Sequence, residues 1–263
     1  MNKKVTCLFV VVVFSLVVQA HEFWLQPNKF QFAVGETASI ECMVGENFVG
    51  KKWDLAKNRI HALDHHTKDI SISLLKEIQP GVKTFNTKLE KAGTHLFVLR
   101  SENVFIEMAG EEFNEYLKED GLDDVLTQRK NTNTLDKPAK EFYARCAKVM
   151  VKAGDKTDET YKIKVGLPLE IVPVNDPYTT KPGEEISFMV LFEGKPLAFT
   201  LVKVWNRKDN NTILQNIYTQ KDGIITTRLS NTGSWMVSSV KMVPSKDAAA
   251  DWQSYWASFV FGI

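Results

Sequence analysis

Short segments in which apolar and polar residues alternate dominate the chain after its first 20 residues. A period of two is typical of β-strands with one buried face, whereas apolar residues at three- and four-residue spacing indicate a helix. Gly, Pro and Asn separate the segments, as expected for tight turns. The expected strands are residues 29–34, 37–44, 69–75, 83–89 and 94–101 in the first half and residues 185–192, 199–206, 213–220, 224–229, 234–242 and 255–263 in the second. This spacing predicts a mainly β fold built from Ig-like β-sandwiches.

The segment between these two strand-rich halves predicts helices. Phe113, Tyr116 and Leu117 follow helical spacing, with acidic residues before them and Gly121 after them. Residues 122–130 and 137–148 have a similar pattern, so we expect a helical excursion over residues 111–148 and a further strand near 161–165. Because the β pattern resumes after Pro168, the chain is predicted to form an N-terminal β-sandwich of residues 21–166 and a C-terminal one of residues 167–263.

Residues 1–20 have the pattern of a signal peptide. Lys3 and Lys4 precede an apolar run over residues 5–18, and Ala20 supplies the small residue of a cleavage site. Such a signal would direct the protein to the periplasm, and its cleavage after Ala20 would leave His21 as the first residue. An uncleaved anchor is the alternative, but the run is shorter than the roughly 20 apolar residues of a membrane span. No later run approaches that length, so no transmembrane segment is expected in the mature chain.

The net charge bears on whether the chain binds nucleic acid, and the cysteine content bears on whether it forms a disulfide bond. Loss of Lys3 and Lys4 with the signal changes the formal net charge from +1 to −1, so the chain lacks the basic surface that nucleic acids require. Cys42 and Cys146 would remain after cleavage and could pair in an oxidising compartment. Because Cys42 alternates with apolar residues on the inner face of a predicted strand, two buried free thiols are the favoured interpretation.

The sequence lacks the common catalytic motifs. It has no Gly-x-Ser-x-Gly, no His-Glu-x-x-His, no Cys-x-x-Cys and no phosphate-binding glycine-rich loop. We therefore expect a protein that is not an enzyme.

The mature N-terminus is a candidate metal ligand. The α-amine and the imidazole Nδ1 of His21 would close a six-membered chelate, and an α-amine with a pKa of about 7.7–8.0 loses its proton readily near neutral pH. Such nitrogen ligands suit Ni, Co, Cu or Zn better than Mg or Ca.

Two other histidines are candidates to complete that site. His61, His65 and His66 lie on one extended segment, where successive side chains face opposite sides and cannot all converge. His95 begins a strand with apolar residues on both faces. Because strand ends cluster at the poles of a sandwich, the predicted metal site consists of His21, His66 and His95, although a half-buried structural role for His95 stays open.

The chain is rich in tryptophan, with six residues, Trp24, Trp53, Trp205, Trp235, Trp252 and Trp256. Core packing is the commoner role of such residues, and an aromatic platform for sugars is the alternative.

Several segments carry a resemblance to a known family: His21–Pro27, Tyr116–Leu122, Glu141–Lys148, Gly166–Pro173, Asp176–Tyr178, Gly194–Leu197 and Trp252–Phe261. They resemble exported bacterial proteins described as periplasmic components of nickel or cobalt uptake, which carry a domain of unknown function. Residues 194–243 are also similar to transthyretin-like modules of carboxypeptidases and outer-membrane receptors. The resemblance implies two β-sandwiches, the second transthyretin-like, and a periplasmic metal-handling role in which His21 carries over. Cys146 stands where such a chain is expected to have Tyr or Phe, which argues against a bridge to Cys42.

Three functions follow from these observations. The first is a periplasmic binding protein for a divalent transition metal, of the nickel or cobalt class with Cu or Zn as alternatives, that serves a membrane transport component. The second is a non-catalytic structural or interaction module of the cell envelope that docks a partner or a glycan. The third is a copper-dependent oxidative enzyme, since an N-terminal histidine and one further histidine supply three nitrogen ligands.

Overall fold

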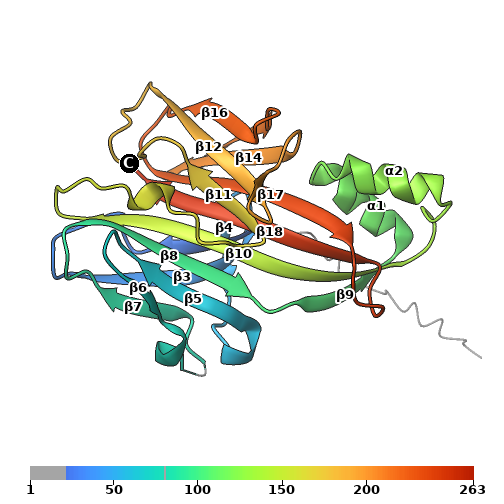
Figure 1. The fold of residues 1–263 in the computed structure, drawn as a ribbon, viewed down its shortest axis with the longest axis horizontal. Helices are drawn as coiled ribbons and strands as arrows, with labels where there is room; N and C mark the ends of the chain where they lie inside the picture. Colours follow the sequence, from blue (N-terminus) through green and yellow to red (C-terminus); the bar gives the residue numbers. More distant parts are fainter. Residues whose placement is uncertain (1–21, 80) are drawn as a thin grey trace, which may run out of the picture.

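A ten-stranded β-sheet forms the centre of the computed structural model, which describes residues 22–79 and 81–263 (Figure 1). Its main path runs in the order β15 (Asn211–Tyr218), β14 (Leu201–Lys208), β17 (Ser234–Pro244), β18 (Trp252–Gly262), β10 (Ala139–Ala153), β8 (Gly93–Ser101), β5 (Ile60–His66) and β6 (Ser71–Ser73). Two shorter strands, β2 (Gln31–Phe32) and β9 (Val104–Met108), also pair with β10.

Two four-stranded sheets cover the central sheet, one on each face (Figure 1). The first consists of β1 (Glu22–Pro27), β3 (Thr37–Glu46), β4 (Val49–Lys52) and β7 (Thr84–Lys88). The second consists of β11 (Leu169–Pro173), β12 (Glu185–Phe192), β13 (Lys195–Pro196) and β16 (Ile224–Arg228). Along β10, Val149 and Val151 pack in the core beneath the first sheet, whereas Cys146 and Met150 pack beneath the second. The prediction of a mainly β fold of sandwich type is therefore confirmed.

Parallel pairing of β10 with β18 joins the two halves of the chain. The pairing runs from Glu141 opposite Trp252 to Val149 opposite Val260. The predicted boundary at residues 166–167 falls between the 3-10 turn η3 (Thr160–Lys162) and β11, and strands from both sides of it share the central sheet.

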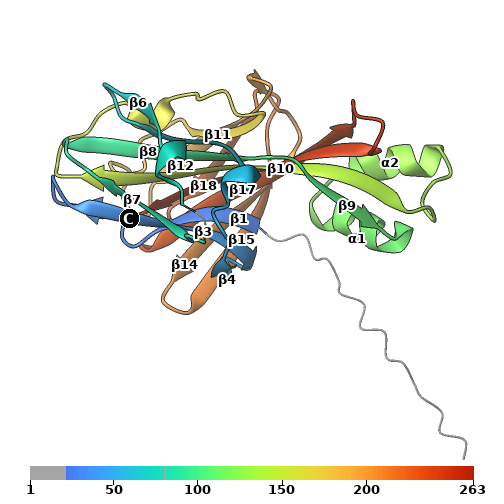
Figure 2. The same ribbon diagram turned by 90° about the horizontal axis from the view of Figure 1, so that it is seen from below.

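Two α-helices lie together beyond one end of the β-sheets (Figures 1 and 2). They are α1 (Gly110–Glu119) and α2 (Asp123–Asn131), which agree with the expected helices to within one residue at each end. Phe113 and Leu117 of α1 are fully buried, in a cluster with Met242 and Trp252 of the central sheet. The apolar face predicted from their spacing is thus the face that packs against the sheet.

The expected helix over residues 137–148 is wrong, because this segment is the first two thirds of β10. Phe142 and Cys146 are four residues apart, a spacing that places two side chains on one face of a helix or of a strand alike. A strand covered on both faces also loses the alternation of apolar and polar residues by which exposed strands are found. The strand expected near 161–165 is also absent from the described residues, where the chain forms η3 instead.

Both described cysteines are buried free thiols. Cys42 lies in the core beneath the first small sheet, and Cys146 lies in the core beneath the second. The free-thiol interpretation is confirmed and the disulfide alternative is wrong. Burial raises the pKa of both thiols, that of Cys146 to about 11, so both groups are protonated and unreactive at neutral pH.

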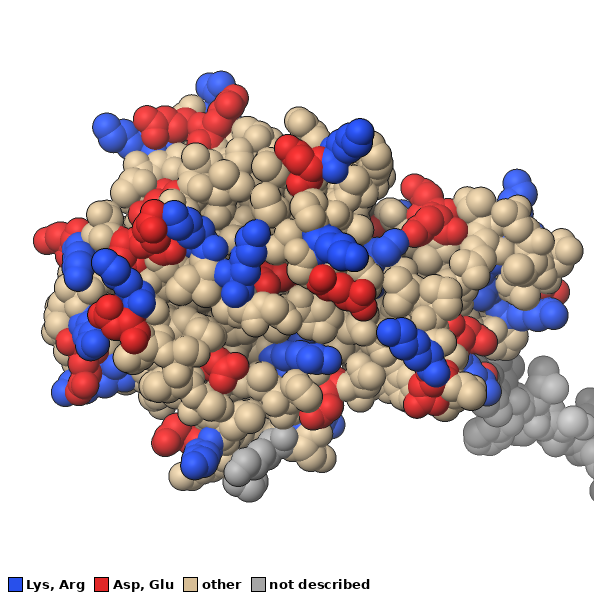
Figure 3. Space-filling model, in the orientation of Figure 1, with Lys and Arg blue, Asp and Glu red and all other residues tan. Residues whose placement is uncertain are grey.

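Basic and acidic side chains are interspersed over the face of the molecule shown in Figure 3. Within residues 22–79 and 81–263, no helix combines the length and apolar character needed to cross a membrane.

A buried ion pair stands between the central sheet and the second small sheet. Lys148 Nζ lies 2.9 Å from Glu170 Oε1, and the two side chains are 1% and 2% exposed. The Glu170 carboxylate also accepts hydrogen bonds from the backbone N–H groups of Val165 and Gly166. These bonds satisfy a charge that burial would otherwise make costly.

Replacing Glu170 by glutamine should destabilise the protein strongly, because the Lys148 ammonium would remain buried without its counter-charge. We expect Glu170→Gln to lower the free energy of unfolding by about 3–5 kcal/mol, measured by urea denaturation. Glu185→Gln, at an exposed position of β12, is the control and should change stability by less than about 0.5 kcal/mol. Equal stability of the two variants would show that the pair contributes nothing to the fold.

Candidate functional site

The structure separates the histidines expected to form a metal site. His21 lies outside the described residues. His66 pairs with Leu96 across β5 and β8, and His65 pairs with Phe97. Because successive side chains of a strand face opposite sides, His95 shares a face with His65 and Phe97, whereas His66 lies on the other face. The structure therefore does not bring His66 and His95 together.

His95 belongs to a buried hydrogen-bonded pair with His65. Its Nε2 lies 3.0 Å from the carbonyl oxygen of Lys91 and its Nδ1 lies 2.8 Å from His65 Nε2. A carbonyl only accepts, so His95 Nε2 donates and Nδ1 must accept from His65. The lone pair that a metal would need is thus already engaged.

Burial keeps the two rings neutral. It lowers the pKa of His65 to about 3, with smaller contributions from His95 and His66. The His65 ring also stacks on Phe97, with 4.5 Å between ring centroids and 11° between planes. These features describe a structural pair in the core.

His66 is half-buried on the opposite face, towards Lys148 and Glu170. Burial lowers its pKa, and its Nε2 atom is buried without a hydrogen-bond partner among the described residues. Within that same part of the chain, no group of three or more His, Cys, Asp or Glu side chains is placed to hold a metal ion.

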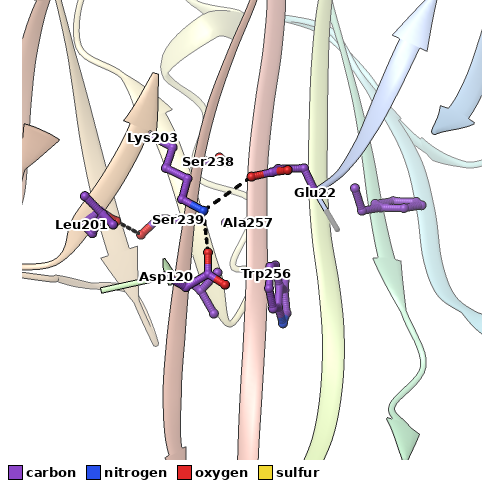
Figure 4. Close-up of a pocket in the computed structure, with 10 residues that line it drawn as sticks. Glu22, Asp120, Leu201, Lys203, Ser238, Ser239, Trp256 and Ala257 are labelled. Carbon is purple, nitrogen blue, oxygen red and sulfur yellow. Dashed lines mark hydrogen bonds and ion pairs between the residues drawn. The ribbon is translucent and has the colours of Figure 1, made fainter. Parts of the chain in front are cut away.

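Ionisable side chains do gather where β1 begins, one residue after His21. Lys203 Nζ lies 2.7 Å from Asp120 Oδ1 and 3.6 Å from Glu22 Oε1. Figure 4 shows the lysine of β14 between the two carboxylates, with Trp256 and Ala257 of β18 beside them. The Glu22 and Asp120 side chains are 9% and 4% exposed, and Lys203 is 18% exposed. They line a small cavity of about 20 Å³, which has room for one water molecule.

A glycine at the end of α1 positions Asp120 in this group. Gly121 has a φ of +66°, a conformation that suits glycine. A Cβ atom there would also lie 2.7 Å from Leu201 Cβ. The turn therefore lets the helix end close against β14, which places the Asp120 carboxylate on Lys203.

Burial and ion pairing oppose each other in these three groups. Burial raises the pKa values of Glu22 and Asp120, and the nearby Lys203 ammonium limits the rise. Burial disfavours the charged form of Lys203, but the two carboxylates outweigh it and raise the pKa of the lysine. The lysine therefore stays charged while its partners hold their protons more tightly than exposed acids do.

Glu141 of β10 adds a third buried carboxyl group. Its Oε1 atom accepts hydrogen bonds from the Tyr116 hydroxyl at 3.2 Å and from the Ser254 hydroxyl. Its Oε2 atom is buried without a partner among the described residues. Burial raises the pKa of Glu141 to about 7, the hydrogen bonds oppose the rise, and Asp120 adds to it.

The serine and a tryptophan connect Glu141 to the first group. Trp256 Nε1 donates to Ser254 Oγ at 3.1 Å, and its ring stacks on Tyr116 with 5.7 Å between centroids. We call the whole set the N-terminal polar cluster: Glu22, Tyr116, Asp120, Glu141, Lys203, Ser254 and Trp256. With three acidic groups and one lysine, it has more carboxyl groups than cations, and Glu141, with its pKa raised to about 7, can hold a proton near neutral pH.

Sequence reasoning did not find this cluster, because its members come from five separate segments. A local pattern gives Asp120 no role of its own, and it assigns Trp256 to core packing or to an aromatic platform for sugars. One signal was available: Lys203 shares a strand face with Leu201 and Trp205, both buried, and a charged residue on an inward face needs a partner.

Comparison with known proteins places the chain in a family without assigning an activity. A family described as a domain of unknown function, DUF4198, matches residues 18–242. A search of the curated proteins gave no match.

Among solved structures, an α-2-macroglobulin from Salmonella reacted with methylamine is 10% identical with a TM-score of 0.24; the match covers 91% of this chain and 14% of the macroglobulin chain. Three N-terminal domains of the outer capsid protein Hoc of bacteriophage RB49 are 12% identical, with a TM-score of 0.18, and cover 92% of this chain and 59% of theirs. Domains FN1–FN3 of chicken CNTN1 are 8% identical, with a TM-score of 0.21, and cover 90% of this chain and 66% of theirs.

The raised pKa of Glu141 predicts that stability falls as pH rises from about 4.5 to about 7. In this window the folded protein binds a proton that the unfolded chain has released, so the free energy of unfolding decreases by up to about 1.4 kcal/mol per pH unit. Urea denaturation at pH 5 and pH 8 should show this decrease, and Glu141→Gln should make the dependence shallower. The exposed Glu185→Gln control should keep the slope of the unmodified protein. An identical slope in Glu141→Gln would disprove the assignment.

Proposed function

Because the chain belongs to the DUF4198 family, whose description gives no activity, we propose a function from the site itself. We propose that this is an exported periplasmic binding protein that captures a divalent transition metal through its mature N-terminus. Nickel or cobalt is the proposed cargo, with copper and zinc as alternatives, and a membrane transport component is the proposed recipient. The observation that carries the proposal is the rigid, buried start of β1 immediately after His21.

That start is held more firmly than a chain terminus usually is. Glu22 to Leu25 are all buried, and β1 pairs with β3 from Glu22 opposite Gly45 onward. Consecutive Cα atoms are about 3.8 Å apart, so a chelate formed by His21 would be attached to a fixed point. Pre-organisation of this kind lowers the entropic cost of binding.

Position along β10 determines which residues can join such a chelate. Glu22 lies beside Trp256 (Figure 4), which pairs with Arg145 of β10, whereas His95 pairs with Val151. Six residues of strand separate these positions, or about 20 Å. Ligands from the N-terminal polar cluster are therefore the proposed partners of His21, in place of His66 and His95.

The donors proposed at the start of the mature chain suit a transition metal. The α-amine and ring of His21 would supply two nitrogens, and Glu22 would supply a carboxylate oxygen. Glu22 is the more distant partner of Lys203, at 3.6 Å against 2.7 Å for Asp120. Moving the Glu22 carboxylate from the lysine to a metal therefore costs less free energy than moving that of Asp120. When bound, the metal would be cargo, and the chain's residues would only hold and release it.

Metal titration of the correctly processed protein tests this proposal. We expect one-to-one binding of at least one of Ni²⁺, Co²⁺, Cu²⁺ and Zn²⁺, measured by calorimetry on protein that begins at His21. One extra N-terminal residue should weaken binding at least tenfold, because it removes the α-amine from the chelate. Glu22→Gln should also weaken binding severalfold.

Two histidine variants serve as matched controls. His66→Gln and His95→Gln should keep the affinity of the unmodified protein within twofold if the cluster supplies the remaining ligands. Unchanged affinity after the N-terminal extension would refute a chelate at His21, and a large loss in either histidine variant would refute the ligand set.

A second candidate, a module that docks a partner without metal, is favoured by the edge of the central sheet. Strand β15 ends that sheet, and its Ile213, Leu214 and Tyr218 side chains are 48%, 42% and 54% exposed. Exposed apolar edge strands are recurrent sites of strand addition. Failure of all four metals to bind the processed protein would favour this candidate over the first.

A further inference from the structure

Arg145 of β10 carries a charge for which the described residues provide no acidic partner. Its guanidinium carbon lies 4.8 Å from the ring centroid of Phe23, 5.2 Å from Tyr143 and 5.5 Å from Trp53. The three rings come from β1, from β10 itself and from the residue after β4. No ion pair of Arg145 occurs among residues 22–79 and 81–263.

Three other cations in the described core have ion-pair or hydrogen-bond partners. Lys148 pairs with Glu170, and Lys203 pairs with Asp120 and Glu22. Arg129 donates to three backbone carbonyls and to Asn114. Aromatic rings compensate the charge of Arg145 only in part, because a cation–π contact is weaker than a hydrogen-bonded ion pair.

Arg59 adds a second positive charge near that of Arg145. Arg59, at the end of the 3-10 turn η1 (Lys57–Arg59), lies 6.0 Å from the ring centroid of Trp53. Both guanidinium groups, that of Arg145 and that of Arg59, therefore contact the ring of Trp53. Burial lowers the pKa of Arg145. Tyr143 and Cys42 oppose this effect, and the like charge of Arg59 adds to it.

We propose that Arg145 and Arg59, which both contact Trp53, form a binding site for a small oxyanion of the carboxylate or phosphate class. A guanidinium presents a planar fork of N–H donors that matches two oxygens of such an anion. Arg145 is partly exposed and Arg59 is exposed, so a solute can reach both. The rings of Phe23, Tyr143 and Trp53 hold the Arg145 side chain in place and exclude water from one side of it.

The anion would supply the negative charge that this part of the core lacks. The backbone also fixes Arg145, because its N–H donates to the Ser101 hydroxyl at 2.8 Å. The site is thus built on a rigid central strand, and its proposed ligand is opposite in charge to that of the metal site. The two proposals rest on different residues and can fail separately.

Titration with citrate and with inorganic phosphate, each against sodium chloride of equal ionic strength, tests the site. The protein should first be stripped of metal on a chelating resin, since a soluble chelator is itself a polycarboxylate. We expect saturable binding of at least one oxyanion, detected by calorimetry and by a rise in the thermal midpoint. Whichever of the two binds more tightly identifies the class of anion.

Three glutamine variants separate the site from general charge effects. Arg145→Gln should weaken oxyanion binding at least tenfold, and Arg59→Gln should weaken it about threefold or more. Arg228→Gln, at an exposed position of β16, should leave the affinity unchanged. Because Arg59 is exposed, its variant is expected to fold even if Arg145→Gln does not.

Two results would overturn the proposal. The first is the absence of saturable binding of both oxyanions to the unmodified protein, which would show that Arg145 only packs against the three rings. The second is equal affinity in Arg59→Gln and Arg228→Gln, which would show that any binding reports overall charge.

Discussion

Burial of β10 on both of its faces is the constraint on which the rest of the structure depends. A strand in this position must satisfy its backbone through two neighbours and offer apolar side chains to two different cores. Strand β18 pairs with residues 141–149, and on the other side β9 pairs with residues 139–143 and β8 with residues 150–153. The two small sheets provide the cores. This strand and its parallel partner join the first and second halves of the chain within the central sheet.

The same arrangement explains why charged groups are buried in this protein. β10 contributes Glu141, Arg145 and Lys148 to its surroundings, and each meets a different environment. Lys148 meets a carboxylate, Glu141 meets two hydroxyl groups, and Arg145 meets aromatic rings. Lys148 is neutralised by its partner, Glu141 has hydrogen bonds to one of its two oxygens only, and Arg145 retains its charge. The degree of compensation therefore differs between positions of one strand, and it separates a purely structural pair from groups suited to binding.

Local patterns predicted much of the fold, because most of its strands have one face towards solvent or towards a small core. The limits of β12, for instance, follow from the alternation of Ile186, Phe188 and Val190 with their neighbours. The same reasoning failed for β10, where double burial removes the alternation, and for β1, whose first four residues are all buried. Site prediction was harder still. The residue type and the position in a strand suggested His66 and His95 as metal ligands. The sheet face that each side chain occupies, and its hydrogen-bond partners, depend on strand register. The N-terminal polar cluster depends on contacts between α1, β1, β10, β14 and β18, none of which a local pattern records.

The pairing of β10 with β18 also has a consequence for how the chain reaches its native state. Glu141 and Trp252 face each other across the middle of the central sheet although most of the second half of the chain lies between them. Since β18 is the last described strand, the sheet cannot close until that strand is available, and contacts of such long sequence separation form slowly. During synthesis the first half would persist as an open, incompletely paired intermediate. Such delayed closure leaves an edge of β10 unpaired in the meantime, and an unpaired strand edge is a template for association with a second chain.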